Sequence, residues 1–410
     1  MRSWSRPEVP RLPGHGALPR VFDTSTATTV ELSPDAAAGL YVCGITPYDA
    51  THIGHAATYV AFDTLIRLWL DAGHDVSYVQ NVTDVDDPLL ERATAIDVDW
   101  RELASQQVEL FRGDMLALGV IPPDHYVAVT DMVAPVALAV GRLLNTGTAY
   151  RLGDDVYFDS EAAAASTPWH LGQESLLNRE IMLELAAERG GDPEREGKRD
   201  PLDPMLWMGA RPGEPSWPSE LGNGRPGWHI ECSVIAQEFF DVPMTVAGGG
   251  RDLVFPHHEF TAGHTAALTG HAHARAHVHA GLVAYRGEKM SKSLGNLVFV
   301  SALITDGVDP RAIRLAILRN HYRSDWEWSD QVLTTAESQL AAWDVWAAAV
   351  ADGDGILQQL RDALADDLDT PAALAIVDAR VGSGVAPTPG DLAAIHALLG
   401  VELPSPVAPA

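Results

Sequence analysis

A strand, a turn and a helix follow one another between Gly39 and Leu70, and this order constrains the fold more than any other part of the chain. Gly39–Cys43 is an apolar run typical of a buried strand, and Pro47 marks a turn after it. Apolar residues then recur at helical spacing: Ala56, Tyr59, Val60, Ile66 and Leu70. Residues 74–82 alternate and are rich in β-branched side chains, which predicts a second strand after a crossover helix. The sequence therefore predicts an α/β fold with a Rossmann-like, nucleotide-binding parallel sheet.

Two loops follow the carboxyl ends of these strands, Cys43–Thr46 after the first and Asn81–Thr83 after the second. Because ligands of parallel sheets bind at the carboxyl ends of strands, we expect the two loops to form a pocket. His52 and His55 stand where the helix begins, and a helix N-terminus offers backbone N–H groups to phosphate. Cys43 adds a soft metal ligand. The stretch thus predicts a metal ligand beside a phosphate site.

Changes of pattern along the 410 residues predict several segments. Residues 1–38 are expected to be an N-terminal arm with one or two short strands, and 401–410 a frayed tail. The predicted catalytic domain comprises 39–83 and 205–300, with 84–204 as an inserted connective α/β region. Residues 301–329 then link this domain to a C-terminal helical bundle at 330–400. Within the catalytic domain, Val278–Tyr285 is predicted to be one strand, and the histidine-rich run from His264 to His279 a solvated helix and turn rather than a second metal site.

Composition excludes several classes of protein. The hydrophobic content of 46% is that of a soluble globular protein, and no run approaches the ~18 apolar residues that span a bilayer. The first residues lack the apolar core of a secretory signal. A net charge of −28 argues against a surface that wraps nucleic acid. Two cysteines exclude a disulfide scaffold and predict a reducing cytoplasm.

A second group of residues, Lys289–Ser293 (Lys-Met-Ser-Lys-Ser), follows the predicted strand that ends at Tyr285. Lys289 and Lys292 on such a loop can close over a nucleotide and neutralise the charge that develops at its α-phosphate. A K-x-x-K pair alone is more often part of a solvated face, so the motifs that accompany it decide whether it is interpreted as a nucleotide-binding loop. Together with His52-Ile-Gly-His55, the loop matches the two signatures of class I aminoacyl-tRNA synthetases. This resemblance implies the class I catalytic core, ATP as co-substrate with Mg²⁺, and an acyl-adenylate intermediate.

Cys43, Cys232 and His257 form a third group. Thiolate and imidazole ligands suit Zn²⁺, and all three residues are expected at the rim of one pocket. Three protein ligands leave one tetrahedral position open, which a substrate thiolate can fill in preference to a hydroxyl. The alternatives are a structural zinc ion or none.

The stretches around these residues resemble cysteinyl-tRNA synthetase over roughly residues 20–330, but the chain departs from that family in two places. The synthetases continue the histidine pair as His-His-Glu-Asn-Glu, whose last Glu is a fourth zinc ligand, whereas this chain has His257-His-Glu-Phe-Thr261. It also stops after a short helical region, without an anticodon-reading end. These departures, with Glu188–Pro193 (Glu-Arg-Gly-Gly-Asp-Pro) and Cys43–Tyr48, resemble the cysteine ligases of mycothiol biosynthesis.

This second resemblance implies that the chain joins L-cysteine to the amine of glucosaminyl-inositol through a cysteinyl-adenylate, with release of AMP and pyrophosphate. A cytoplasmic monomer is expected, with neither tRNA nor a membrane as partner. His52, His55, Lys289 and Lys292 are the implied catalytic residues. The implied substrate and adenylate contacts are Cys43, Gly44, Ile45, Thr46, Thr58, Asn81, Val82, Thr83, Trp228, Gly250, Arg251, Asp252 and Val283, the last through its backbone.

Three alternatives remain open at this point. Asp252 could be a loop or capping aspartate rather than a ribose or amine contact. The chain could be a shortened cysteinyl-tRNA synthetase or a paralogue that acts on another carrier. It could also be a non-catalytic zinc-binding or nucleotide-sensing module, although both signatures are present.

Overall fold

Five parallel strands form the central sheet of the part of the chain that this computed structural model describes, residues 1–34, 36–48, 51–290 and 296–404. Their order across the sheet is β11, β10, β3, β4, β5. The strands are β3 (Ala37–Val42), β4 (Asp75–Val82), β5 (His125–Ala128), β10 (Met244–Gly250) and β11 (Ala274–Ala280). The predicted α/β fold with a parallel sheet is confirmed, including the crossover helix α1 (Ile53–Asp71) between β3 and β4.

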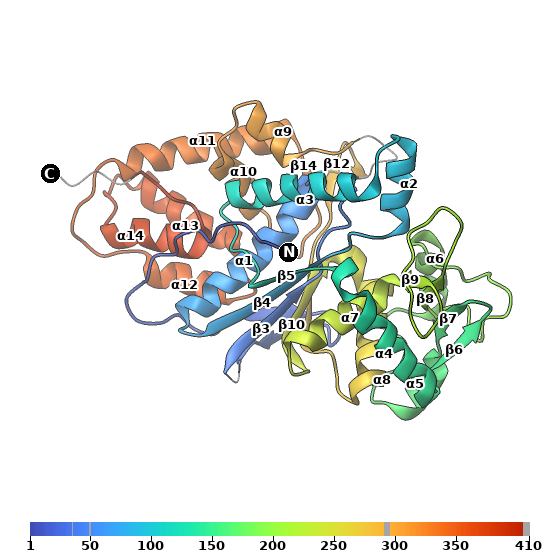
Figure 1. Cartoon of the computed structure of the whole chain (residues 1–410). Coiled ribbons are helices and arrows are strands. Elements are labelled where there is room, and N and C mark those ends of the chain that lie inside the picture. The colour runs from blue at the N-terminus through green and yellow to red at the C-terminus, as the bar shows by residue number, and fades with distance from the viewer. Residues whose placement is uncertain (35, 49–50, 291–295, 405–410) are drawn as a thin grey trace.

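Helices cover both faces of this sheet (Figure 1). One hydrophobic cluster joins the sheet to α1 and α3 (Trp100–Ala117), and a second joins its other face to α7 (Trp228–Phe239). Side chains alternate along β3, so Leu40 and Val42 belong to the first cluster, whereas Tyr41 and Cys43 belong to the second. The register of β3 therefore points Cys43 toward α7.

A smaller antiparallel sheet lies beside the central one, at the lower right of Figure 1. Its strands, in spatial order, are β6 (Ala149–Leu152), β7 (Asp155–Phe158), β8 (Met205–Gly209) and β9 (Gly224–Pro226). The helices of this part of the chain are α2 (Asp87–Ala95), α4 (Val133–Thr146), which follows the short turn Val129–Met132, α5 (Ser160–Ser166) and α6 (Arg179–Glu188). The prediction that residues 84–204 are wholly an insertion is wrong, because β5 within that range pairs with β4.

Residues 330–399 fold into helices, as predicted, and lie on the opposite side of the molecule from the antiparallel sheet (Figure 1). Asp309 caps α10 (Pro310–Leu318) and proline opens it, as the sequence indicates. The remaining elements are β12 (Val283–Tyr285), β13 (Glu288–Lys289), β14 (Trp326–Trp328), α9 (Val300–Thr305), α11 (Asp330–Ala347), α12 (Leu357–Ala365), α13 (Thr370–Gly382) and α14 (Pro389–Ala394), which the turn Ile395–Leu399 follows.

A buried charge cluster, Asp63–Arg67–Arg314, holds α1 to α10 and to the C-terminal turn. Each of the three side chains is at most 1% exposed, and both arginines donate to the Asp63 carboxylate, Arg67 Nε at 2.7 Å. Arg314 Nε also donates to the carbonyl of Leu399 at 2.7 Å. Burial alone would raise the pKa of Asp63, but Arg67 and Arg314 outweigh it and lower that pKa below its usual value. The helix that begins at the predicted phosphate site is therefore anchored at its far end.

Two further predictions about segments are corrected. The predicted strand over Val278–Tyr285 is two strands, since β11 ends at Ala280 in the central sheet and β12 pairs with β13 and β14 instead. The tail begins later than expected, because Val401 and Leu403 are buried in the core. Residues 405–410 lie outside the described part.

The N-terminal arm is packed against the body of the protein. It contains the hairpin β1 (Arg20–Asp23) and β2 (Thr28–Glu31), as predicted. Trp4 is 6% exposed and donates from Nε1 to the carbonyl of Val120 at 2.7 Å, so the arm is fixed from its first residues. None of the helices in the described ranges has the length and apolar character that crossing a bilayer requires.

Candidate functional site

The structure brings together the three side chains that the sequence predicts as metal ligands. Cys43 follows β3 and Cys232 lies on α7, and their Sγ atoms are 4.0 Å apart across the face that the two elements share. His257 precedes α8 (Glu259–Thr269), and its Nε2 lies 3.2 Å from Cys232 Sγ. Within the described residues, this is the group whose donor atoms all lie within 4.8 Å of one another. All three side chains are buried.

The ionisation of the cluster suits a metal cation. A hydrogen bond with Cys232, together with burial, raises the pKa of Cys43, so the thiol stays neutral without a cation. Burial lowers the pKa of His257, so its imidazole is neutral and keeps a lone pair. The Nδ1 of His257 lies 3.1 Å from His229 Nδ1, a contact that aims Nε2 at Cys232. A divalent cation would make the thiolates favourable in this apolar setting.

The two loops at the ends of β3 and β4 are hydrogen-bonded to each other. The Gly44 N–H donates to Asn81 Oδ1 at 2.8 Å, and the Thr83 N–H donates to the carbonyl of Ile45 at 3.0 Å. Gly44 is required at its position, because a Cβ there would lie 1.6 Å from the Asn81 carbonyl oxygen. The predicted pocket wall is therefore a single connected unit.

Thr46, Thr83 and Val82, which belong to these two loops, offer different groups to a ligand. Thr46 is half-buried, and Thr83 is buried and accepts from Asn81 Nδ2 at 3.1 Å. Val82 packs its side chain into the cluster under α1, so it offers a ligand only its backbone.

The start of α1 lies beside the segment that follows the lysine loop. His52 caps the helix through Nδ1, which accepts from the Gly54 N–H at 3.1 Å, and the His52 and His55 rings stack with centroids 3.9 Å apart. The Ile53 N–H donates to the carbonyl of Val298 at 2.9 Å, and the Val300 N–H to that of Thr51 at 3.1 Å. The segment around Val298 and Val300, which follows the second class I signature in the sequence, is thus a neighbour of the first signature in the fold.

The lysine loop itself is described in part. Lys289 ends β13, whose partner strand β12 begins at the buried Val283. Lys292 and the side chain of Lys289 lie outside the described residues.

Thr58, Gly250 and Asp252 also lie together. A Cβ built on Gly250 would be 3.8 Å from Thr58 Oγ1 and 2.7 Å from Asp252 Oδ1. Arg251 turns elsewhere, since its guanidinium pairs with Asp325 at 2.7 Å. Trp228 completes the predicted set, with its ring centroid 4.5 Å from that of His257.

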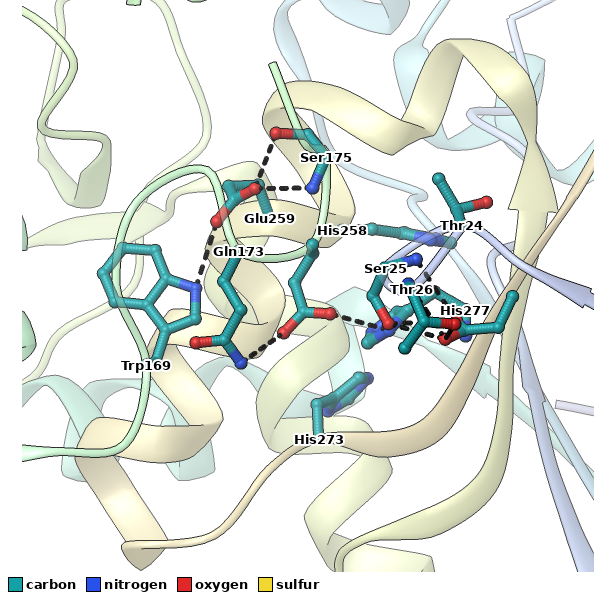
Figure 2. A network of polar contacts seen from close by, with 12 residues as sticks. Thr24, Ser25, Thr26, Trp169, Gln173, Ser175, His258, Glu259, His273 and His277 are labelled. Carbon is teal, nitrogen blue, oxygen red and sulfur yellow. Dashed lines mark hydrogen bonds and ion pairs between the residues drawn. The ribbon is translucent and has the colours of Figure 1, made fainter. Parts of the chain in front are cut away.

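Four of the five histidines in the run from His264 to His279 are buried, so the prediction that the run is solvated is wrong except around the exposed His271. His264, His273, His277 and His279 are each at most 7% exposed. On strand β11, His277 and His279 are two residues apart and therefore share a face. The Nδ1 of His277 lies 2.9 Å from Glu174 Oε2. Figure 2 shows the surroundings of His277, in which Glu259 accepts from Trp169 and Ser175.

A chain of contacts links this buried network to the metal cluster. His258 Nε2 lies 3.2 Å from Cys43 Sγ, and its Nδ1 lies 2.8 Å from His279 Nε2. The Nδ1 of His279 in turn lies 2.8 Å from Thr24 Oγ1. Sequence reasoning missed His258 and His229. The period-2 spacing of His277 and His279 on an apolar strand was the available signal for the network.

Comparisons with known proteins identify the family to which this chain belongs. A family described as tRNA synthetases class I (C) catalytic domain matches residues 29–338. The L-cysteine:1D-myo-inositol 2-amino-2-deoxy-alpha-D-glucopyranoside ligase of Clavibacter michiganensis subsp. michiganensis is 59% identical, with 100% of both chains covered. The ligase of the same name from Thermobispora bispora is 56% identical over 98% of this chain and 100% of its own.

Among solved structures, a Mycobacterium tuberculosis methionyl-tRNA synthetase in complex with methionyl-adenylate has a similar fold. It superposes with a TM-score of 0.61 over 89% of this chain and 88% of its own, at 16% identity. At that identity the likeness concerns the fold alone.

Proposed function

Because the chain belongs to the family of class I (C) tRNA synthetase catalytic domains, and within it groups with the L-cysteine:1D-myo-inositol 2-amino-2-deoxy-alpha-D-glucopyranoside ligases, we propose that it is an ATP-dependent, amide-forming ligase of mycothiol biosynthesis. It joins L-cysteine to the amine of glucosaminyl-inositol. The observation that carries the proposal is the buried Cys43–Cys232–His257 cluster, a donor set that suits a metal able to bind a substrate thiol.

Zn²⁺ is the metal that fits this donor set, because two thiolates and one neutral imidazole are its preferred ligands. Held by Cys43, Cys232 and His257, it would supply an open position that takes a substrate thiolate in preference to a hydroxyl. Thr261 leaves that position free, since its hydroxyl donates to the carbonyl of His229 at 3.2 Å. Serine would therefore be rejected without an editing step.

Other residues of the site orient the rest of the cysteine substrate and the ATP. Thr46, Thr83 and Trp228 surround the place of a small zwitterion at the strand ends. ATP binds with its phosphates between His52–His55 and the lysine loop, while Thr58, Gly250 and Asp252 meet its nucleoside. Lysine occurs in the chain only as Lys198, Lys289 and Lys292, which favours a dedicated role for the loop over a generally charged surface.

The reaction then proceeds in two displacements. A cysteine carboxylate oxygen attacks the α-phosphorus of ATP, and pyrophosphate leaves as its bond to that phosphorus breaks. Lys289 and Lys292, with Mg²⁺ on the phosphates, stabilise the charge of this transition state. The unprotonated amine of glucosaminyl-inositol next attacks the acyl carbon, the acyl–phosphate bond breaks, AMP leaves, and the amide nitrogen loses a proton.

The proposed setting is a reducing cytoplasm, which keeps both cysteines as thiols, and the proposed form is a monomer that uses no tRNA.

The proposal is tested with purified protein, ATP, Mg²⁺, Zn²⁺ and glucosaminyl-inositol, supplied with either cysteine or serine. The expected result is an amide product with cysteine and less than about 1% of that rate with serine, the margin that a site built for one chemical group provides. Equal rates with both amino acids would overturn the thiol-recognition claim, and an absence of product with cysteine would overturn the ligase.

Replacement of Lys289 is expected to slow adenylate formation. Lys289→Ala should reduce cysteine-dependent ATP–pyrophosphate exchange by ~10²–10³-fold, the usual cost of one transition-state charge donor, and leave cysteine binding within about twofold. Arg286→Gln, a nearby exposed cation in the turn between β12 and β13, is the control and should retain normal exchange. If Lys289→Ala lost cysteine binding instead, the loop would serve substrate recognition rather than phosphoryl transfer.

His258 should support the metal through Cys43. Removal of a hydrogen-bonding neighbour of a metal ligand typically costs ~10–100-fold in metal affinity, so His258→Asn is expected to bind Zn²⁺ that much more weakly in a chelator competition. The exposed His271, on the same histidine-rich run, provides the control His271→Asn with unchanged affinity. Equal affinity in the two variants would mean that the contact between His258 and Cys43 does not support the metal.

A further inference from the structure

A cavity of about 260 Å³ lies between α7 and the part of the chain that carries the antiparallel sheet. This volume is close to the lower end of the ~300–1,000 Å³ typical of small-molecule sites. Trp228 and His229 form the end of the cavity nearest the metal cluster. The Trp228 and His257 ring centroids are 4.5 Å apart, and His229 Nδ1 lies 3.1 Å from His257 Nδ1. A molecule in the cavity would therefore reach the acyl group of a cysteine held at that cluster.

The Glu188–Pro193 segment, which resembles the cysteine ligases of mycothiol biosynthesis, lines the same cavity. Arg189, Gly190, Gly191 and Asp192, from the Glu188–Pro193 segment noted in the sequence, all face it. Arg189 also donates to the backbone carbonyls of Asp252 and Phe255, which ties this wall to the loop beside Gly250. This segment thus lines the same space as Trp228 and His229, and no step of adenylate formation uses it.

The lining combines hydrogen-bond donors, acceptors and apolar faces. Arg225 is 4% exposed; its Nη2 pairs with Asp87 and with Glu214 at 3.1 Å, and its Nε has no hydrogen-bond partner among the described residues. Asp86 accepts from the Asp87 N–H at 2.8 Å through one oxygen of its carboxylate. Trp228 and Phe260 add aromatic surface. Sugar and cyclitol rings, with hydroxyls at their edges and C–H groups on their faces, need this combination.

The charge of the cavity also selects a ligand. Burial raises the pKa of Asp86 to about 6, so this carboxylate is mostly ionised at neutral pH. An ammonium or amine is attracted to such a group, and it finds Asp86 available because Asp87 and Asp192 on the same lining are paired with Arg225 and Lys198. A neutral polyol that carries one amine satisfies both the charge and the hydrogen-bonding groups.

We propose that this cavity is the acceptor site, which binds an amine-bearing polyhydroxylated ring compound through Asp86 at its amine and Arg225 Nε at a hydroxyl, with Trp228 against a ring face. The proposal rests on the ligase function and specifies where glucosaminyl-inositol binds. It assigns Asp86 and Arg225 to binding of the acceptor and to no part of cysteine activation.

Two substitutions separate acceptor binding from activation. Asp86→Asn retains a side-chain oxygen that caps α2, and Arg225→Lys retains a cation for Asp87 and Glu214 but lacks the Nε donor. Each should raise the KM for glucosaminyl-inositol at least tenfold and leave cysteine-dependent ATP–pyrophosphate exchange within about twofold. Glu91→Gln, exposed on the same helix α2 and absent from the cavity lining, is the control and should change neither quantity.

The outcomes of these experiments distinguish a failure of the proposed acceptor site from a failure of the proposed ligase function. If the wild type forms product and both variants keep its acceptor KM, the acceptor site is wrong and the ligase stands. If the wild type exchanges pyrophosphate but forms no product from glucosaminyl-inositol, the ligase function fails and the acceptor site with it.

A measurement on the wild type alone covers the case in which a variant folds poorly. Glucosaminyl-inositol should slow amide hydrogen exchange in residues 188–193 and 225–229, and protection confined to other segments would overturn the proposal.

Discussion

Cys232→Ala is expected to lose bound zinc and cysteine-dependent ATP–pyrophosphate exchange together. The substitution removes the ligand that contacts both of the others, with Cys43 Sγ at 4.0 Å and His257 Nε2 at 3.2 Å. The loss should exceed the ~10–100-fold that removal of a mere neighbour of a ligand causes, because two remaining donors cannot close a tetrahedral site. Zinc content by atomic absorption and exchange with labelled pyrophosphate measure the two effects.

The matched control is Ser233→Ala, one residue further along α7. Ser233 is also fully buried, and its hydroxyl contacts Thr265 at 2.8 Å rather than the cluster, so this variant should retain zinc and exchange. Full exchange by Cys232→Ala without bound zinc would contradict thiol recognition by the metal. Loss of zinc with exchange intact for both cysteine and serine would show that the metal is purely structural.

Asp63→Asn is expected to produce the largest loss of stability, about 3–5 kcal/mol, since it leaves two buried guanidinium groups without their counter-charge. Arg67 and Arg314 are each 1% exposed and cannot turn toward water. Urea unfolding followed by tryptophan fluorescence measures the change. Asp75→Asn, an exposed aspartate at the start of β4, should unfold at the wild-type urea concentration.

The pH dependence of this variant follows from the lowered pKa of Asp63. A depressed folded-state pKa stabilises the protein above the unfolded value of about 3.9, and this contribution disappears as pH falls through the folded pKa. The difference in stability between wild type and Asp63→Asn should therefore be full at pH 7 and shrink at strongly acidic pH. A difference that grows toward acid pH would contradict the assigned charge state.

The parts of the fold that the sequence predicted are those set by local pattern. The β3–α1–β4 unit has a continuous apolar run, a turn and a helical repeat, and α10 has both a capping aspartate and a proline at its first turn. β5 was missed because His125–Ala128 is too short to show a period between two helical stretches. The division between β11 and β12 depends on which sheet each strand joins, and no local pattern contains that information.

The candidate site likewise has a part that the sequence could predict and a part that depends on tertiary packing. Cys43, Cys232 and His257 could be placed together because each follows a strand end or opens a helix at one edge of a parallel sheet. The contact of His258 with Cys43, and the burial of the histidines on β11, depend on rotamers and on how the 169–175 loop packs over that strand. The cavity beside Trp228 likewise forms between segments far apart in the chain. Its lining follows from tertiary packing, although the sequence already marked Glu188–Pro193 as unusual.

The most direct test of the account is the fate of activated cysteine when both acceptors compete. Protein loaded with ³⁵S-cysteine and ATP is mixed in a single turnover with equal concentrations of glucosaminyl-inositol and tRNA for cysteine, and the label in each product is counted. The label is expected to enter the amide of glucosaminyl-inositol and to stay at background in the tRNA. Label recovered as a cysteinyl ester of the tRNA, with the sugar amine left unreacted, would contradict it.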